Sequence, residues 1–474
     1  MAGTLDSSPG YQITPSSVKA TLPTNYITNF DFLNQYLPDT YEQEFERYGN
    51  RSIASFLRMV GAELPSNSDL IKWAEQGRLH TKYASVNADD AENTNLAEFT
   101  VGDASITACN FRVNQTVFLS ANVGTASAKG IVTAVSGLTF TVAFYAASGS
   151  PFAQNDTVTA FVYGSEFAKG TTGMIGSLEA EDSFFECKPI IIKDKYAVSG
   201  SDMAQIGWVE VTTENGATGY LWYMKSEHET RLRFEDYMEM AMVEGVPAES
   251  GSGAANWINL IPTPVQSPAT TGAAGTQGLF DTVESRGNVW SGGNPSTLSD
   301  FDTIVQRLDK QGAISENALF LNRQFSFDID DMLAAQNSYG VGGTSYGLFD
   351  NSEQMALNLG FTGFRRGYEF YKTDWKYLND AALRGGLVGG AVNGVLVPAG
   401  TTTVYDQVLG KNAKRPFLHV RYRASEAENR RYKTWMTGSA GGASTSDLDA
   451  MEVNFLSERA LCTLGANNFF IFKG

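Results

Sequence analysis

A long helix is predicted for Leu221–Val243, where charged residues alternate with apolar ones until a glycine and a proline end the pattern. At 1.5 Å per residue, this helix extends about 34 Å. The sequence favours two ion pairs of the i,i+4 type along it, Glu227–Arg231 and Glu229–Arg233. We therefore expect the helix to act as a spine to which other elements attach.

Two long strands are predicted immediately before this helix. The first spans Phe184–Val198 and the second Ile206–Thr213, and Asn215-Gly216 is a strong turn signal. An isolated two-stranded hairpin is marginally stable in water. We therefore expect the hairpin arm, residues 166–220, to lie on another surface.

Residues 99–165 differ from the rest of the chain, because only four of these 67 positions are charged. Short β-rich runs separated by Gly and Ser turns indicate a small antiparallel barrel or sandwich inserted into the chain. The alternative is an ordinary β-meander within a larger domain. The predicted strands are Thr116–Leu119, Gly130–Val135, Leu138–Tyr145 and Thr157–Val162.

The N-terminal part, residues 1–98, is predicted to begin as an extended arm rich in Thr, Ser, Pro and Asn. Such an arm has little core of its own and must lie on another surface. Helices are expected near Asp39–Val60 and over Leu70–Gln76, the latter because Asn67-Ser68-Asp69 resembles an N-cap and Gly77 a stop.

The second half of the chain alternates helices and strands, which indicates a mixed α/β core. Thr297 is expected to cap a helix with a buried stripe from Leu298 to Leu308. A buried strand is predicted for Ala318–Asn322 and a helix for Phe325–Gln336. The chain ends in two β-rich runs, Met451–Leu464 and Asn468–Phe472.

Composition excludes several classes of protein. The net charge of −17 argues against a dedicated nucleic-acid binder. Three distant cysteines suit a reducing compartment and give no disulfide framework or zinc site. We expect no signal peptide and no membrane helix, because the N-terminus lacks an apolar core and the long uncharged runs are broken by turns. Only 18% of residues are charged, which suits a surface covered by partners.

No motif favours catalysis. Gly343–Gly347 matches G-x-S-x-G around Ser345, but a glycine-rich loop precedes it where a nucleophile elbow needs a strand. The three histidines, His80, His228 and His419, lack metal-ligand spacing. We therefore expect no enzyme activity, metal or cofactor.

A basic stretch, Lys411–Lys433, carries a local charge of +6 with three interleaved aromatic residues. It could contact nucleic acid. We favour a partner for the acidic excess, either in the same chain or in a neighbouring subunit. Arg365 and Arg366 form a smaller basic site.

The order of these parts resembles the major capsid protein of tailed bacteriophages of the Hong Kong 97 type. Three stretches carry the resemblance: the hairpin running into the helix from IIIKDKYAVSG to MAMVEG, LSDFDTIVQRLDKQGAISENALFLNRQFSFDIDDM, and MEVNFLSERALCTLGANNFFIFKG. It covers most of residues 165–330 and 400–474. The segment SDLIKWAEQGRLHTKY, together with the hairpin, is similar to the major capsid protein of crAss-like phages.

The resemblance implies an α+β, Hong Kong 97-like capsid fold with an inserted small antiparallel β-domain. Its parts would be the N-terminal arm and linker (1–98), the inserted domain (99–165), the long β-hairpin or E-loop (166–220), the spine helix of the peripheral domain (221–255), the axial domain (256–400), the return of the peripheral domain (401–464) and the final strand (465–474).

The resemblance further implies a head shell of hexamers and pentamers around double-stranded DNA, assembled in the host bacterial cytoplasm. The partners would be copies of the chain, a portal, decoration proteins, a scaffold and the packaged genome, without a membrane. Some family members crosslink a hairpin lysine to a neighbour's asparagine, here Asn412 or Asn429. The candidates for contacts between subunits are Lys188, Lys193, Lys195, Glu229, Arg231, Arg233, Glu235, Arg365, Arg366, Arg421 and Arg423.

Two alternatives remain open at this point. A bacterial nanocompartment shell would share the fold and enclose an enzyme cargo. A carbohydrate-binding β-protein would use the aromatic residues of the 99–165 segment, Phe118, Phe140, Phe144 and Tyr145, which we otherwise expect in a barrel core.

Overall fold

The computed structural model of this 474-residue chain describes residues 56–57, 62–90, 94–179, 182–204, 211–212, 218–219, 222–255, 273–312, 314–336, 363–406, 411–442 and 444–474. The chain divides into two compact units. One comprises Trp73–Phe185, and the other comprises the residues on either side of it. We describe each unit by itself.

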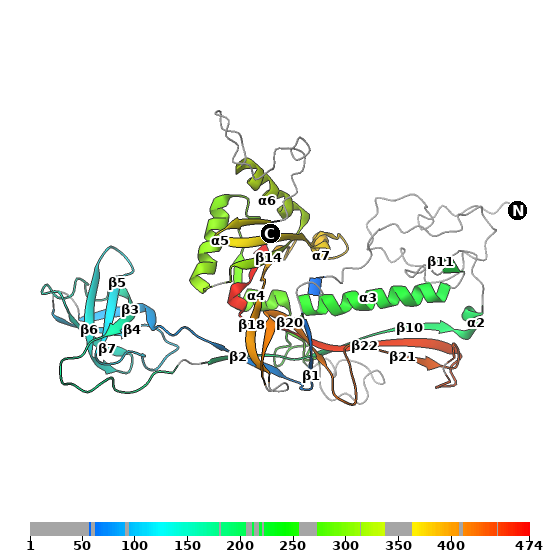
Figure 1. Cartoon of the computed structure of the whole chain (residues 1–474), viewed down its shortest axis with the longest axis horizontal. Helices are drawn as coiled ribbons and strands as arrows, with labels where there is room; N and C mark the ends of the chain where they lie inside the picture. The colour runs from blue at the N-terminus through cyan, green and yellow to red at the C-terminus, as the bar shows by residue number, and fades with distance from the viewer. Residues whose placement is uncertain are drawn as a thin grey trace. The chain divides into compact units, whose positions relative to one another are not determined.

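The Trp73–Phe185 unit is built around a closed antiparallel barrel with the strand order β3-β4-β7-β6-β5-β8 (Figure 1). Phe99, Phe140 and Val142 lie in its core. The four strands expected between residues 99 and 165 are present, but two further barrel strands begin upstream of residue 99. The strands are β3 (Lys82–Asp90), β4 (Leu96–Val101), β5 (Gln115–Ala121), β6 (Ser127–Ser136), β7 (Thr139–Phe144) and β8 (Thr157–Ser165).

The predicted helix at Leu70–Gln76 is wrong. Ile71–Gln76 forms strand β2, which pairs with β9 (Asp182–Cys187). Burial along β2 alternates residue by residue, which is the period of a strand with one covered face. The cap-like residues before it were a local signal, whereas the partner strand lies about a hundred residues away and could not be inferred from them.

In the other unit, a five-stranded sheet has the order β1-β20-β22-β10, and β21 also pairs with β22. The helix α3 (Trp222–Glu244) lies along β10 and β22, as predicted for the spine (Figure 1). Short helix α2 (Gly200–Met203) follows β10. The strands are β1 (Ala62–Ser66), β10 (Ile190–Ser199), β20 (Leu418–Arg423), β21 (Lys433–Gly438) and β22 (Ala450–Thr463).

The first predicted long strand is interrupted in the structure, and its pairing with the second strand in a hairpin stays a prediction. Phe184–Val198 is divided between β9 and β10, and β10 pairs antiparallel with β22, from Ile190↔Arg459 to Ser199↔Ala450. The second predicted strand lies largely outside the described residues, which include only the short pair β11 (Val211–Thr212) and β12 (Thr218–Gly219). Strand β22 is 14 residues long and begins about 250 residues after β10, so the patterns of neighbouring segments did not reveal this pairing.

A six-stranded mixed sheet has the order β13-β23-β17-β14-β16-β15. Its alternate residues enter two cores: Leu319 and Leu321 of β14 face one, and Phe320 faces the other. The strands are β13 (Asn288–Trp290), β14 (Glu316–Leu321), β15 (Gly363–Arg366), β16 (Tyr368–Asp374), β17 (Val392–Pro398) and β23 (Phe470–Lys473).

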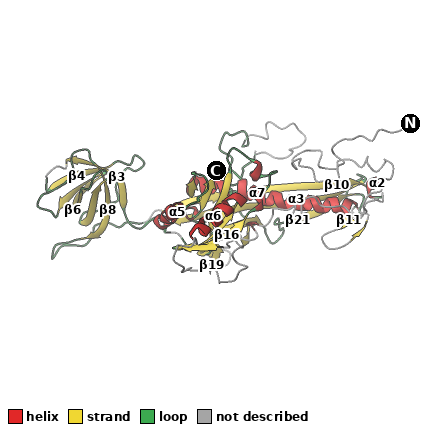
Figure 2. Cartoon of the chain, turned by 90° about the horizontal axis from the view of Figure 1, so that it is seen from above, coloured by secondary structure: helices red, strands yellow, loops and turns green. Residues whose placement is uncertain are grey.

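Helices cover both faces of this sheet (Figure 2). The helices α5 (Leu298–Gln311) and α6 (Arg323–Gln336) pack on the Leu319 side. The opposite side holds α4 (Leu279–Arg286), α7 (Lys376–Asn379) and the last turn of α3, together with apolar residues of β20 and β22. This shared core joins the two sheets of the unit.

The predictions for the second half of the chain are largely confirmed. α5 begins with a capping box between Thr297 and Asp300 and ends at Gly312, which has a left-handed conformation. β14, α6, β22 and β23 occupy the predicted segments. Shorter elements are β18 (Thr401–Asp406), β19 (Lys411–Pro416), η6 (Arg384–Gly386) and η7 (Ala466–Asn468). Gly343–Gly347 and almost all of Asp39–Val60 lie outside the described residues.

Candidate functional surfaces

One face of the β10–β22–β21 sheet packs against α3, and the other face presents an unusual mixture of side chains. The register places Lys195 of β10 opposite Asn454 of β22, which in turn lies opposite Trp435 of β21, and Ile191 and Lys193 share this face because side chains alternate along β10. Ile191 is 53% exposed and Trp435 is 38% exposed. We call these five residues the outer sheet face. It includes two of the predicted contact lysines.

Lys195 is tied to its own sheet. Its Nζ lies 2.8 Å from Glu452 Oε1, and Thr437 Oγ1 donates to the other oxygen of that carboxylate at 3.1 Å. The bond from Lys195, followed by that from Thr437, lowers the pKa of Glu452. Lys193 and Lys188 are exposed, Lys188 between β9 and β10.

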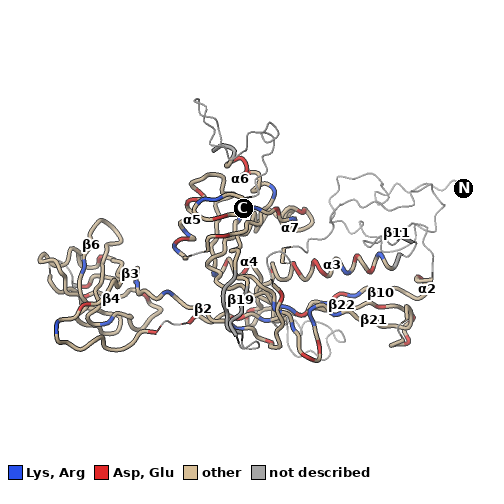
Figure 3. The backbone as a smooth tube through the Cα atoms, viewed as in Figure 1, with Lys and Arg blue, Asp and Glu red and all other residues tan. Residues whose placement is uncertain are grey.

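The solvent side of α3 carries predicted contact residues Arg231 and Arg233, which are exposed with Met224 and Tyr237. Charges of both signs follow one another along this helix (Figure 3). The ion pairs in the structure differ from those predicted: Lys225–Glu229 at 3.6 Å and Arg231–Glu235 at 3.9 Å. Arg233 instead donates to Thr230 Oγ1 at 3.3 Å.

The basic stretch meets acidic residues of the same chain. Glu63 of β1 accepts from Arg459 Nη1 at 3.3 Å and pairs with Arg431. Burial lowers the pKa of Arg459, while the charge of Glu63 opposes that effect. We call these three residues the Glu63 cluster. The cluster links β1, which lies at an edge of the sheet, to residues near the C-terminus of the chain.

A second acidic group stands beside this cluster. Glu458 lies 2.7 Å from Arg430 Nε and 3.8 Å from Arg423 Nη1, and Arg423 also pairs with Asp69. Predicted contact residue Arg421 is half-buried on β20. The ion pairs confirm that the basic stretch has partners within the chain.

The smaller basic site lies on β15. Arg366 makes a two-pronged interaction with Asp302 of α5, with Nη2 donating to Oδ2 at 2.7 Å, and this bond lowers the pKa of Asp302. Arg365 is exposed and lies 3.7 Å from Glu369. Arg366 therefore links strand to helix, while Arg365 faces outward.

Sequence reasoning missed a group at the end of α3. Glu244 accepts two hydrogen bonds from Arg384, at 2.6 and 2.5 Å, and one from the Tyr377 hydroxyl at 2.5 Å. The Arg384 guanidinium also lies 5.1 Å from the ring centre of Phe280. Because the partners are more than 130 residues apart, no local spacing could have revealed this link between α3 and the six-stranded sheet.

The aromatic residues considered for carbohydrate binding have different surroundings. Phe140 is buried and Phe144 packs against the barrel core, whereas Phe118 contacts the ring of Phe161 at 5.2 Å. Tyr145 is exposed, and its hydroxyl donates to Glu166 at 2.5 Å. They do not form one shared surface for a sugar.

Within the described residues, no group of His, Cys, Asp and Glu has the arrangement of a metal site. All three cysteines are buried and carry free thiols. Among the helices that the structure describes, none is long and apolar enough to cross a bilayer.

Comparisons with known proteins give structural likenesses at low sequence identity. No family model and no curated protein matches the sequence. A chain from Microbacterium phage Oxtober96 aligns with a TM-score of 0.38 and 8% identity, over 93% of this chain and 97% of that one. For a chain from Mycobacterium phage Ogopogo, these values are 0.34, 10%, 94% and 99%. For the capsid of a native GTA particle, they are 0.37, 9%, 93% and 95%.

These structures belong to phages and to a GTA capsid.

Proposed function

We propose that this chain is a structural shell subunit, the major capsid protein of a tailed double-stranded DNA bacteriophage. The observation that supports the proposal best is the two-layer arm formed by α3 and the β10–β22–β21 sheet. It exposes apolar side chains on both surfaces: Met224 and Tyr237 on the helix, and Ile191 and Trp435 on the sheet. A sheet covered by a helix on one face only leaves its other face and the solvent side of the helix for contacts with neighbouring subunits, as a shell requires.

The way in which the arm is anchored also suits a shell. The core shared by α3, β20, β22 and the six-stranded sheet, together with the Glu244–Arg384 pair, fixes one end of the arm. A rigidly anchored arm can transmit one fixed geometry to each neighbour. Many weak contacts repeated by symmetry then add up to a stable assembly.

In this proposal, subunits form hexamers and pentamers of an icosahedral head assembled in the host cytoplasm. Portal, decoration and scaffold proteins and the packaged genome would be the partners, and the role would be structural rather than enzymatic. The crAss-like lineage is supported by the sequence resemblance alone.

The direct test is electron microscopy of the purified full-length chain, with sizing by sedimentation. We expect closed uniform particles or rings of five and six subunits. A monodisperse monomer across salt concentrations would overturn the proposal. Nuclease-protected DNA inside particles from the native source would support a phage head, whereas an enzyme cargo without DNA would identify a nanocompartment.

A further inference from the structure

An irregularity in the barrel coincides with a pocket. In the β5–β8 ladder, Thr116 pairs with Gly164 and Val117 with Val162, so Tyr163 is an extra residue that bulges from β8. Bulges redirect side chains and often occur beside functional sites. A pocket of about 390 Å³ opens at this bulge, a volume within the range of small-molecule sites, about 300–1,000 Å³.

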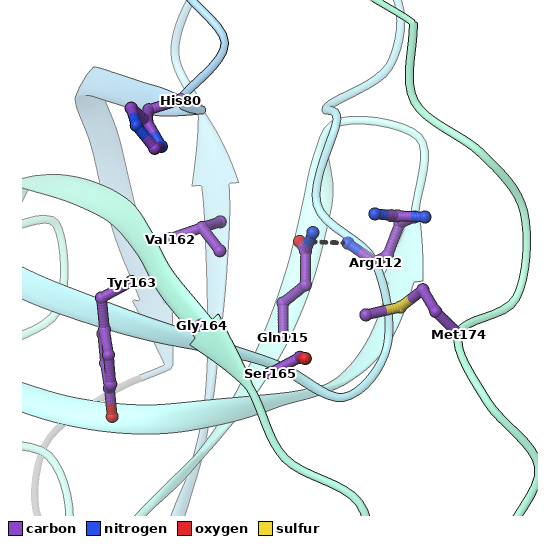
Figure 4. A pocket seen from close by; sticks show the side chains of 8 residues that line it. All are labelled: His80, Arg112, Gln115, Val162, Tyr163, Gly164, Ser165 and Met174. Carbon is purple, nitrogen blue, oxygen red and sulfur yellow. Dashed lines mark hydrogen bonds between the residues drawn. The ribbon is translucent and has the colours of Figure 1, made fainter.

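Hydrogen-bond donors dominate the polar lining of the pocket, which consists of His80, Arg112, Gln115, Val162, Tyr163, Gly164, Ser165 and Met174 (Figure 4). None of these eight residues carries a carboxylate. Glu166 follows Ser165 in sequence, but its carboxylate already accepts a hydrogen bond from Tyr145. Outside this lining, Lys129 Nζ lies 5.7 Å from the ring centre of Tyr163.

Two donors are held in place by hydrogen bonds within the Trp73–Phe185 unit. Gln115 is only 5% exposed, and its Oε1 accepts from the backbone N–H of Arg112 at 2.8 Å. This bond leaves Nε2 without an acceptor among the described residues. Arg112 Nη1 donates to the carbonyl of Gly176 at 2.9 Å, whereas its buried Nε has no partner in the described part of the chain.

The other lining groups suit a ring with hydroxyl substituents. In Figure 4, Arg112, Gln115 and Met174 gather on one side, and His80 lies across Val162 from them. Donors on opposite sides can hold two polar groups of one molecule, and Val162 and Met174 offer apolar surface between them. A lone inorganic anion would leave most of this volume unused.

We propose that this pocket binds a carboxylate-bearing monosaccharide, with the carboxylate at Arg112 and Gln115 and the hydroxyls toward His80 and Ser165. A guanidinium pairs with a carboxylate through charge-assisted hydrogen bonds, which are about twice as strong as neutral ones. The proposal does not depend on the shell function, because every residue that it uses belongs to the Trp73–Phe185 unit.

The test is saturation-transfer NMR and calorimetry of the full-length chain with D-glucuronate, glucose and glucose 6-phosphate. We expect millimolar binding of glucuronate and weaker binding of the other two. Arg112→Ala should weaken glucuronate binding by about tenfold or more, because it removes a charge-assisted hydrogen bond to the carboxylate. Arg112→Lys should recover only part of the affinity, because an ammonium cannot form the two-pronged contact.

Lys169→Ala is the matched control, since it removes one exposed positive charge from the same unit outside the pocket lining. It should leave binding unchanged. His80→Ala, at an exposed position, should weaken binding severalfold and keeps the test valid if Arg112→Ala does not fold. No binding of glucuronate, equal binding of glucose, tighter binding of glucose 6-phosphate, or full affinity in both pocket variants would each overturn the proposal.

Discussion

The barrel and the α3 arm solve the problem of stability in opposite ways. In the barrel, β3 to β8 close on themselves, so each of these strands has two neighbours and one continuous core lies inside. In the arm, one layer of helix covers one face of the sheet, and the other face leaves side chains such as Ile191 and Trp435 exposed. A closed barrel has no unpaired strand edges. A two-layer arm, in contrast, can bury its exposed apolar side chains by contacting a neighbouring subunit.

The barrel and the arm also differ in how far apart along the sequence their paired strands lie. All the barrel strands lie within residues 82–165, whereas β10 pairs with a strand that begins about 250 residues later. The barrel is therefore able to form early and locally, while the arm needs the C-terminus of the chain in place. Unfolding experiments should separate the two regions.

The largest effect is expected from Phe234→Ala in the arm. Phe234 is fully buried, with its ring centre 5.6 Å from that of Tyr432 and 5.7 Å from that of Phe455. Removing a buried phenylalanine side chain costs about 3–5 kcal/mol of unfolding free energy. Differential scanning calorimetry should show the arm transition at a lower temperature and the barrel transition unchanged.

Phe140→Ala is the matched variant in the barrel, because Phe140 is equally buried there. It should lower the barrel transition and leave the arm transition in place. If both variants lowered one common transition by similar amounts, the two regions would not be independent units and the comparison would fail.

The next effect is expected from Glu63→Gln, which removes the negative charge from the Glu63 cluster. The Arg459 side chain is only 7% exposed, so without the Glu63 carboxylate its positive charge would be buried without that negative partner. Breaking a buried pair costs about 3–5 kcal/mol, and we expect about 2–3 kcal/mol here because Glu63 is itself 29% exposed. Urea unfolding monitored by circular dichroism measures the loss.

The control is Glu428→Gln, which removes a carboxylate from the exposed Lys433–Glu428 pair in the same region. Exposed pairs contribute little to stability. A loss of stability as large as that of Glu63→Gln would show that burial does not determine the contribution of these ion pairs.

Local patterns predicted most of the described helices and strands of the second half of the chain but not their distant partners. The spine helix follows from its charge pattern and its terminal glycine, and α5 follows from Thr297 and Asp300, because these signals lie within a few residues of one another. The pairing of β10 with β22 and the Glu244–Arg384 contact depend on residues brought together only by the fold. For the same reason the sequence suggested Lys193 and Lys195 as contact residues without revealing that Trp435 lies on the same face, across Asn454 from Lys195.

A smaller effect is expected from pH. Lys195 and Thr437 lower the pKa of Glu452 below its ordinary value of 4.5, so the folded state binds a proton less readily than the unfolded chain. This contribution to stability is complete above the unfolded pKa and is lost as pH falls through the lower folded pKa. In Glu452→Gln, the melting temperature of the arm should therefore fall less steeply than in the native chain as pH is lowered from about 5. An unchanged pH profile would exclude a role for this pair.

The smallest effect on unfolding is expected from Arg231→Glu combined with Arg233→Glu. Both side chains are exposed on α3, and such surface changes alter stability by about 0.5 kcal/mol or less. If this side of the arm contacts neighbouring subunits, the same variant should nevertheless sharply reduce the yield of particles in sedimentation and electron microscopy. Lys82→Glu with Lys169→Glu makes the same change of charge at exposed positions in the barrel unit.

The contrast between these two variants separates local charge from net charge. Because both become more acidic by the same amount, a general effect of net charge would impair assembly in each. Loss of assembly in the α3 variant alone would locate a subunit contact on that helix. Normal particles from the α3 variant would exclude Arg231 and Arg233 as contact residues and leave the outer sheet face as the side of the arm to test next.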